Sequence, residues 1–202
     1  KAIRYAEDNG ASICNLSLTS PTNDQALYCA IRDSSMLFVA AAGNDGKDID
    51  RTPVYPASYE LDNVISAANI SCGGELHESS NYGVGSVDLA APGSYILSTT
   101  PGNTYSYMTG TSMAAPMVTG AAAMVWSHFD GIGAAEVKEI LLNSVTPLDS
   151  LSGKVKTGGM LNVGAALRYD LGTLSGNAFE AGGRRPENGT APHLEARTER
   201  TL

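Results

Sequence analysis

Residues 107–126 read YMTGTSMAAPMVTGAAAMVW, a short polar segment that leads directly into a long apolar run. Residues 113–125 contain almost only Met, Ala, Val and Gly, which predicts a helix buried on nearly all sides. Thr111 or Ser112 is expected to cap its first turn, because a short hydroxyl side chain accepts a hydrogen bond from a free amide there. Such a helix would hold Ser112 at a fixed point, at the positive end of the helix dipole.

Pro116 lies about one turn into this predicted helix. Proline has no backbone N–H, so the carbonyl of Ser112 loses its helical donor. We therefore expect an unsatisfied carbonyl at Ser112, a local strain of the kind found at reactive positions. The simplest alternative is that Ser112 is a helix cap without further function, because hydroxyl residues commonly begin helices.

Alternating strand-like and helix-like segments surround this helix. Residues 36–42 (MLFVAAA) form a continuous apolar run, which is typical of a strand buried on both faces of a parallel sheet. The other expected elements are strands at residues 11–18, 63–69 and 86–90, helices at residues 2–9, 23–33, 133–145 and 160–167, and a hairpin at residues 95–108. This alternation predicts an α/β fold with three αβα layers, a mostly parallel sheet and a buried central helix.

Composition divides the chain near residue 170. Residues 1–170 are long enough for one compact domain with a sizeable core. In residues 171–202, Gly, Glu, Arg, Pro and Thr dominate, which predicts a disordered extension. The formal net charge of -8 argues against a nucleic-acid partner, and no apolar run is long enough to span a membrane. No signal peptide is expected in this chain, since residues 1–9 have the pattern of an amphipathic helix.

Several segments resemble motifs of the subtilisin-like serine proteases, the subtilases. Residues 110–116 (GTSMAAP) resemble the nucleophile motif of that family, and residues 39–46 (VAAAGNDG) resemble the segment that carries its oxyanion-hole Asn. Residues 89–93 (LAAPG) and the turn at residues 101–103 follow in the family's order. The resemblance covers most of residues 1–169. It implies a subtilisin-like three-layer fold.

The resemblance implies a serine endopeptidase that cleaves polypeptides through an acyl-enzyme on Ser112. It assigns the oxyanion site to the side chain of Asn44 and the backbone N–H of Ser112. From composition alone, Asn44 lies in a Gly-Asn-Asp-Gly run and reads as a turn residue. The matching order of the two segments favours the oxyanion role.

The resemblance also implies two walls of a primary substrate pocket. The residues concerned are Ser17, Leu18, Thr19 and Ser20 on one wall and Ala41, Ala42 and Gly43 on the other. Thr19 and Ser20 stand where the family has glycines, and Val54 stands where glycine is common at the pocket floor. These larger residues predict a tight pocket that prefers small or unbranched P1 side chains.

The chain offers no convincing catalytic base. Its three histidines are His77, His128 and His193, and none has the family's His-Gly-Thr setting. No Asp has the Asp-Ser/Thr-Gly setting either. Because the order in subtilases is Asp, His, Ser, the resemblance implies that the other two triad residues and the first strands of the sheet precede Lys1. The chain alone would be inactive, with an N-terminal catalytic segment and a pro-segment as its partners.

Two other functions were weighed. An α/β-hydrolase requires a strand directly before the nucleophile and a His after it, whereas a hairpin arm and a Thr-Gly hinge precede Ser112. A catalytically inactive subtilase relative, acting as a binding or regulatory protein, would also lack a base here. The presence of both Ser112 and Asn44 favours the enzyme.

The resemblance implies no cofactor and no metal ion for the chemistry. Structural calcium is common in the family and binds loop carbonyls near a Tyr-Pro-x-x-Tyr segment such as residues 55–59. The sequence shows no cage of carboxylates around that segment. The resemblance also implies an extracellular or cell-envelope location.

Overall fold

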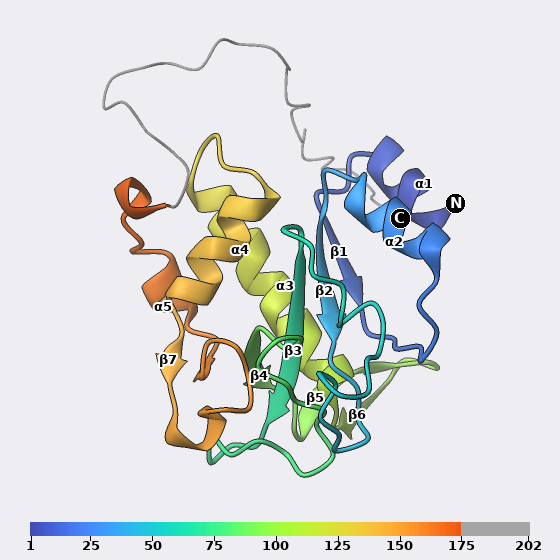
Figure 1. Cartoon of the computed structure of the whole chain (residues 1–202), viewed down its shortest axis with the longest axis vertical. Coiled ribbons are helices and arrows are strands. Elements are labelled where there is room, and N and C mark those ends of the chain that lie inside the picture. Colours follow the sequence, from blue (N-terminus) through green and yellow to red (C-terminus); the bar gives the residue numbers. More distant parts are fainter. Residues whose placement is uncertain (175–202) are drawn as a thin grey trace, which may run out of the picture.

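A computed structural model describes residues 1–174 and places a six-stranded sheet at its centre (Figure 1). The strand order is β1-β2-β3-β4-β8-β7. The strands are β1 (Ile13–Leu16), β2 (Leu37–Ala41), β3 (Val64–Ile70), β4 (Leu89–Pro92), β7 (Thr146–Pro147) and β8 (Gly159–Met160). All neighbours pair in parallel except β7, which is antiparallel to β8. The mostly parallel sheet predicted from the sequence is confirmed.

Helices cover both faces of the sheet (Figure 1). On one face lie α3 (Thr111–His128) and α4 (Ala134–Asn143), and on the other lie α1 (Ala2–Asp8) and α2 (Gln25–Arg32). A short helix, α5 (Val163–Ala166), packs beside α4. The three-layer αβα architecture is therefore confirmed.

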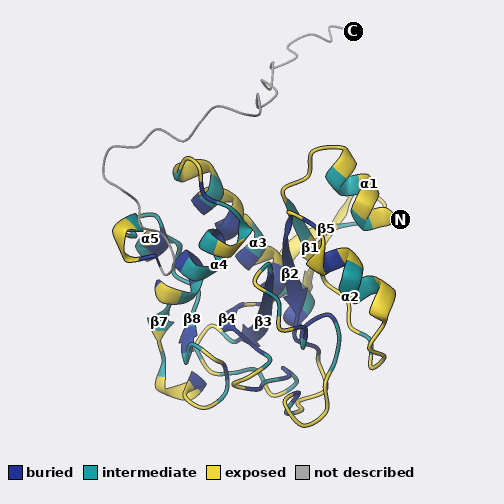
Figure 2. Cartoon of the chain, turned by 45° about the horizontal axis from the view of Figure 1, so that its top comes forward, coloured by how far each residue is buried: buried dark blue, intermediate teal, exposed yellow. Residues whose placement is uncertain are grey.

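Strand β2 is buried along its whole length, as its apolar run predicts. Its side chains alternate between two cores, because successive residues of a strand point to opposite faces. Leu37, Val39 and Ala41 pack with α3 and α4, whereas Phe38 packs with Ile31 of α2. Figure 2 shows β2 and β3 as the dark interior between more exposed helices. This buried pair of strands gives the loop after β2 a rigid base.

A separate hairpin leads the chain to α3. Strands β5 (Ile96–Thr100) and β6 (Thr104–Met108) pair antiparallel, with Thr100 opposite Thr104. Gly102 and Asn103 both have positive φ in the turn between them, a conformation that glycine and asparagine adopt most easily. The predicted hairpin is confirmed, and its second strand ends just before the N-terminus of α3.

Helix α3 is not buried on nearly all sides, so that prediction is wrong. One face packs on the sheet through Ala114, Val118 and Val125. The other face carries an exposed apolar stripe, which consists of Pro116, Met117, Gly120, Ala123 and Met124. The sequence could not distinguish the faces, because apolar residues occur all around the helix. The edge strand β1 lies beside α3 and pairs, within residues 1–174, with β2 alone.

The packed domain extends slightly beyond the predicted limit at residue 170. Leu171–Thr173 form a short 3-10 turn, and Leu174 is buried against the core cluster of α3 and α4. The remainder of the predicted extension, residues 175–202, lies outside the described residues, as does His193. Within residues 1–174, every helix is too short or too polar to cross a bilayer.

Candidate active site

Three loops meet the N-terminus of α3 at the carboxyl ends of the parallel strands. Ser17 follows β1, Asn44 comes shortly after β2, and Gly93 follows β4. The backbone N–H of Gly110 donates to the carbonyl of Gly93 over 2.9 Å, which ties the start of α3 to this edge. Ligand sites of open α/β sheets form at the carboxyl ends of the strands. The loops therefore bring Ser112 to the edge where a reactive group is expected.

The side chain of Asn44 is bound directly to the residue before Ser112. Its carboxamide oxygen accepts hydrogen bonds from the backbone N–H of Thr111 (2.8 Å) and from the Thr111 hydroxyl (3.1 Å). Two donors at one atom identify it as the oxygen, so the NH2 group of Asn44 remains for another acceptor. The Thr111 hydroxyl in turn accepts from the N–H of Gly43 (3.1 Å). Hydrogen bonds therefore join Gly43 and Asn44 directly to Thr111 at the start of α3.

Capping of α3 differs from the prediction. The helix begins at Thr111, with Gly110 at the capping position, and no side chain of its own segment caps it. Asn44 supplies the missing acceptor from a different loop. The prediction that Thr111 or Ser112 caps the helix is therefore wrong, and the hydroxyl of Ser112 is left without that structural task.

Ser112 is half-buried, and its carbonyl is not unsatisfied. The hydroxyl of Ser17 donates to this carbonyl over 2.8 Å and replaces the donor that Pro116 lacks. The Ser112 hydroxyl makes only a long contact, 3.4 Å, with the carbonyl oxygen of Ser17. Among the hydrogen bonds of residues 1–174, the backbone N–H of Ser112 has no acceptor. The segment is firmly held, while the two groups of Ser112 that a substrate would need remain available.

Asn81 is a buried residue that fixes the loop carrying Asn44. Its side-chain oxygen accepts from the backbone N–H groups of Asp45 and Lys47, both at 3.0 Å. Its side-chain nitrogen donates to the carbonyl of Ala42 over 2.9 Å. The side chain of Asn81 therefore holds the backbone in place both before and after Asn44. Asn81 was not predicted from the sequence, because an Asn in a Ser-rich loop belongs to no chemical motif.

Two glycines permit the close packing of this edge. A Cβ atom on Gly43 would collide with the side-chain nitrogen of Asn81, and the positive φ of Gly43 also disfavours a side chain. A Cβ atom on Gly93 would lie 2.6 Å from the carbonyl oxygen of Gly110 and 2.6 Å from Oδ1 of Asn69. Larger residues at either position would displace the start of α3 or the loop that carries Asn44.

Neither described histidine is hydrogen-bonded to Ser112. His128 ends α3, roughly 24 Å along the helix from Ser112 at about 1.5 Å per residue. The ring of His77 contacts the hydroxyl of Ser79 at 2.9 Å, in the loop after β3. The described part of the chain, residues 1–174, therefore contains no hydrogen bond between a histidine and Ser112.

The predicted substrate-binding residues divide into two groups. Ser17, Leu18 and Thr19 are exposed beyond the end of β1, and Ser20 is paired with Tyr55 through two backbone hydrogen bonds of 2.8 Å. The second group, Ala41, Ala42 and Gly43, is buried. The second group precedes Asn44 and is bound to Thr111 and Asn81 through the backbone of Gly43 and Ala42, and its part in a pocket wall stays a prediction.

The sequence profile of the subtilase family matches residues 1–168. The chain belongs to the subtilase family. Its relatives include subtilisin-like protease 2 of Plasmodium falciparum, 37% identical over 186 residues, which cover 86% of this subtilase chain and 14% of that protein. Subtilisin DY of Bacillus licheniformis is 37% identical over 170 residues, which cover 81% of this chain and 60% of that protein. The resemblance inferred from residues 110–116 is thereby confirmed.

A solved structure shows the same fold. The structure of the prenylagaramide maturation protease PagA matches this subtilase with a TM-score of 0.71 at 30% identity. The match covers 83% of this chain and 64% of that chain. The subtilase chain thus spans less than two thirds of the length of each relative described here, with shares of 14%, 60% and 64%.

Proposed function

We propose that this subtilase chain is the nucleophile-bearing part of a serine endopeptidase and that Ser112 attacks the carbonyl carbon of a peptide bond. The observation that carries the proposal is the attachment of the Asn44 carboxamide to Thr111, directly beside Ser112. That attachment leaves two N–H donors near one hydroxyl, which is the arrangement required for acyl transfer. Membership of a protease family supports a polypeptide as the substrate.

In the proposed reaction, the hydroxyl oxygen of Ser112 forms a bond to the peptide carbonyl carbon while its proton passes to a histidine base. The negative charge that develops on the carbonyl oxygen accepts hydrogen bonds from the NH2 group of Asn44 and the backbone N–H of Ser112. The N-terminus of α3 adds the positive end of its dipole at the same place. Collapse of the intermediate releases the amine and leaves an acyl group on Ser112, which water then removes.

We propose further that the Asp and His of the triad belong to a segment that precedes Lys1. The exposed stripe of α3, which includes Met117 and Met124, begins about one turn after Ser112, and the loop after β1 contacts Ser112 through Ser17. Within residues 1–174, one edge of β1 has no partner strand. The stripe and this edge offer an apolar surface and a strand edge that such a segment would cover. Without the histidine the chain alone should show negligible turnover, because loss of one triad member removes nearly all of the triad's contribution.

The substrate is proposed to lie in extended form along residues 17–19, which are exposed beyond the end of β1. Val54 packs against the cluster that contains Ala42, which supports the proposal that its side chain lies at the pocket floor. This arrangement supports a preference for small or unbranched P1 residues. A panel of peptides that differ only at P1 tests it, and equal cleavage after large aromatic residues would contradict it.

Covalent labelling by a fluorophosphonate tests the proposed nucleophile. We expect no rapid labelling of the 202-residue chain alone. We expect labelling at Ser112 once the chain is joined to a segment with an intact His and Asp, and its loss in Ser112→Ala. Rapid labelling of the isolated chain would overturn the missing-base proposal. A joined protein with both residues intact that resists labelling would overturn the assignment of Ser112.

An inactive relative with a binding or regulatory role is the second candidate. The observation in its favour is that neither His77 nor His128 contacts Ser112. The coding sequence before Lys1 discriminates the two functions. Asp-Ser/Thr-Gly and His-Gly motifs in that sequence support the enzyme, and substituted motifs support the inactive relative.

A further inference from the structure

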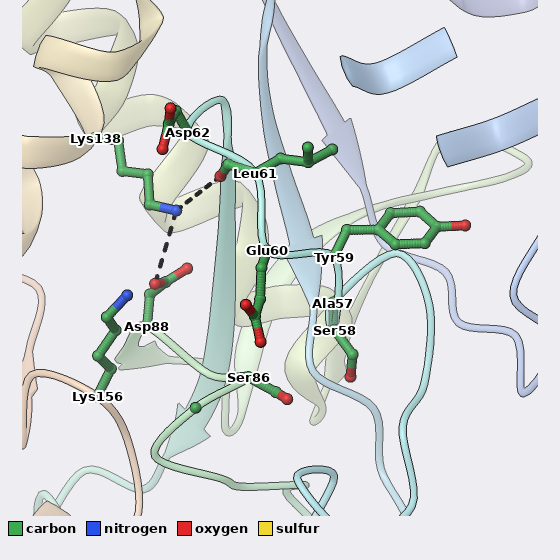
Figure 3. Close-up of a pocket in the computed structure, with 11 residues that line it drawn as sticks. Ala57, Ser58, Tyr59, Glu60, Leu61, Asp62, Ser86, Asp88, Lys138 and Lys156 are labelled. Carbon is green, nitrogen blue, oxygen red and sulfur yellow. Dashed lines mark hydrogen bonds and ion pairs between the residues drawn. The ribbon is translucent and has the colours of Figure 1, made fainter. Parts of the chain in front are cut away.

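A polar pocket lies at the opposite end of the parallel strands from Ser112, where β3 and β4 begin (Figure 3). Its volume is about 380 Å³. Residues 57–62 form one side, and Asp88, Lys138 and Lys156 are among the side chains that close it. The pocket therefore adjoins residues 55–59, the segment near which the family resemblance implies structural calcium.

Lys138 reaches from α4 into this pocket and is surrounded by oxygen atoms. Its Nζ donates to the carbonyl of Val64 over 2.6 Å and to the carbonyl of Leu61 over 3.0 Å. The same nitrogen lies 3.9 Å from Oδ1 of Asp88 (Figure 3). Two of the three N–H donors of this ammonium group therefore have carbonyl acceptors, and the carboxylate of Asp88 is an ion-pair partner at a longer distance.

Asp88 is held in place from the other side. Its second carboxylate oxygen accepts a hydrogen bond from the backbone N–H of Ser66 over 2.9 Å. The side chains of Asp88 and Lys138 are only 11% and 17% exposed. Burial raises the pKa of Asp88 and lowers the pKa of Lys138, and the attraction between the two groups opposes both shifts. Lys156 also attracts Asp88, but less strongly than Lys138 does, so Lys138 is the main counter-charge of this buried carboxylate.

These residues do not fit a calcium ion. Calcium takes roughly six to eight oxygen ligands at about 2.3–2.6 Å. The carbonyls of Leu61 and Val64 already accept hydrogen bonds from Lys138, whose positive charge would repel a second cation. In the described part of the chain, no group of three or more His, Cys, Asp or Glu side chains could hold a metal ion.

We propose that the ammonium group of Lys138 is itself the structural cation of this pocket, carried by α4 and held by oxygen atoms where β3 and β4 begin. The contacts with Leu61, Val64 and Asp88 carry this inference, which is independent of the role of Ser112. Two consequences follow. The chain needs no free metal ion at this place, and truncation of Lys138 leaves a cage of oxygens that binds a small free cation.

Thermal unfolding of the 202-residue chain tests both consequences. The midpoint is measured in choline chloride, sodium chloride and calcium chloride at equal ionic strength, and after treatment with EDTA. We expect the same midpoint for the wild-type chain in all four conditions. For Lys138→Ala we expect a loss of about 10 °C in choline, because the buried carboxylate of Asp88 loses its ion-pair partner and keeps only the weaker attraction of Lys156. We expect a partial recovery in sodium or calcium.

Lys156→Ala is the matched control, because it removes a lysine from the same pocket and leaves the bonds to Leu61 and Val64 intact. We expect it to gain no response to cations. A Lys138→Ala chain whose midpoint is identical in choline, sodium and calcium would overturn the proposal. If that variant does not fold, the wild-type chain provides the test. An unfolding midpoint that calcium raises in the wild-type chain but not in Asp88→Asn overturns the proposal. A wild-type midpoint that calcium does not change supports it.

Discussion

The two ends of the same parallel sheet use their polar groups in opposite ways. At the carboxyl ends of the strands, the NH2 group of Asn44 and the N–H of Ser112 have no protein acceptor within residues 1–174. At the amino ends, Lys138 and Asp88 are almost completely engaged with each other and with backbone groups. Buried polar groups are normally paired, so the end with available donors is the end suited to bind a ligand. We call the edge with Asn44 and Ser112 the reactive edge, after its proposed role, and the edge with Asp88 and Lys138 the structural edge.

The two edges also differ in how they are held. The reactive edge depends on hydrogen bonds between loops, through Asn81 and Thr111, so its groups are fixed while their outer faces stay open. The structural edge depends on one long side chain that extends from α4 to the carbonyls of Leu61 and Val64. Substitutions at the reactive edge should therefore change turnover, and those at the structural edge should change stability.

The largest expected effect is that of Ser112→Ala. In the joined protein that supplies His and Asp, turnover should fall about a million-fold, a figure that comes from subtilisin, a relative of this chain. Stability should change by less than about 0.5 kcal/mol, because the lost hydroxyl makes only a contact of 3.4 Å. Peptide hydrolysis and thermal unfolding measure the two quantities. If Ser112→Ala lost as much stability as Lys138→Ala, the proposed difference between the two edges would be contradicted.

Asn44→Ala should lower turnover by about a hundred- to a thousandfold with little change in KM, again a magnitude measured in subtilisin. The physical reason is the loss of one donor that strengthens as charge develops on the substrate oxygen. Steady-state kinetics of the joined protein provide the measurement. Asn143→Ala is the control, because the side chain of this residue at the end of α4 donates to the hydroxyl of Tyr169 and, within residues 1–174, has no hydrogen bond to Asn44 or Ser112. Equal turnover of the two variants would remove Asn44 from the oxyanion site.

Much of the fold could be predicted from the sequence, because its strongest signals are local. The apolar run of β2, the turn at Gly102 and the amphipathic pattern of α4 each specify one element without reference to the rest. The pairing of Ser112 with Asn44 came from motif resemblance, and the contact between Asn44 and Thr111 agrees with it.

What the sequence did not predict depends on which segments meet in space. Met117 and Met124 read as core residues, since an apolar helix does not reveal which of its faces is covered. No role for Asn81 or Lys138 was predicted from the sequence. Their partners, Ala42 for one and Val64 for the other, are tens of residues away in the sequence, so only the folded packing identifies them.

Asn81→Ala should affect both stability and turnover. It leaves two backbone N–H groups and one carbonyl without partners, which costs about 3 kcal/mol in the free energy of unfolding. A shift of the loop that carries Asn44 should also lower turnover by up to about a hundredfold.

Asn63→Ala is the matched control for Asn81, because Asn63 donates to three carbonyls at the structural edge, those of Ile31, Ser34 and Met36. Urea unfolding and turnover are measured for both variants. We expect similar losses of stability and a loss of turnover only for Asn81→Ala. If Asn63→Ala lowers turnover equally, the effect of Asn81 is general destabilisation and the loop has no separate role.

The smallest expected effect is the pH dependence due to Asp50, a loop carboxylate on neither edge. Burial raises its pKa, but hydrogen bonds from the backbone N–H groups of Gly85 (2.9 Å) and Ser86 (2.8 Å) outweigh burial and lower it. A lowered pKa in the folded state adds stability above the unfolded pKa of about 3.9, and this stability is lost as the pH falls through the folded pKa. The contribution should be under about 1 kcal/mol, because Asp50 is exposed. Asp50→Asn should therefore be less stable than wild type at neutral pH, and urea unfolding should show this difference narrowing in acid. A difference that stays the same from neutral to acid pH would show that these hydrogen bonds do not favour the charged carboxylate.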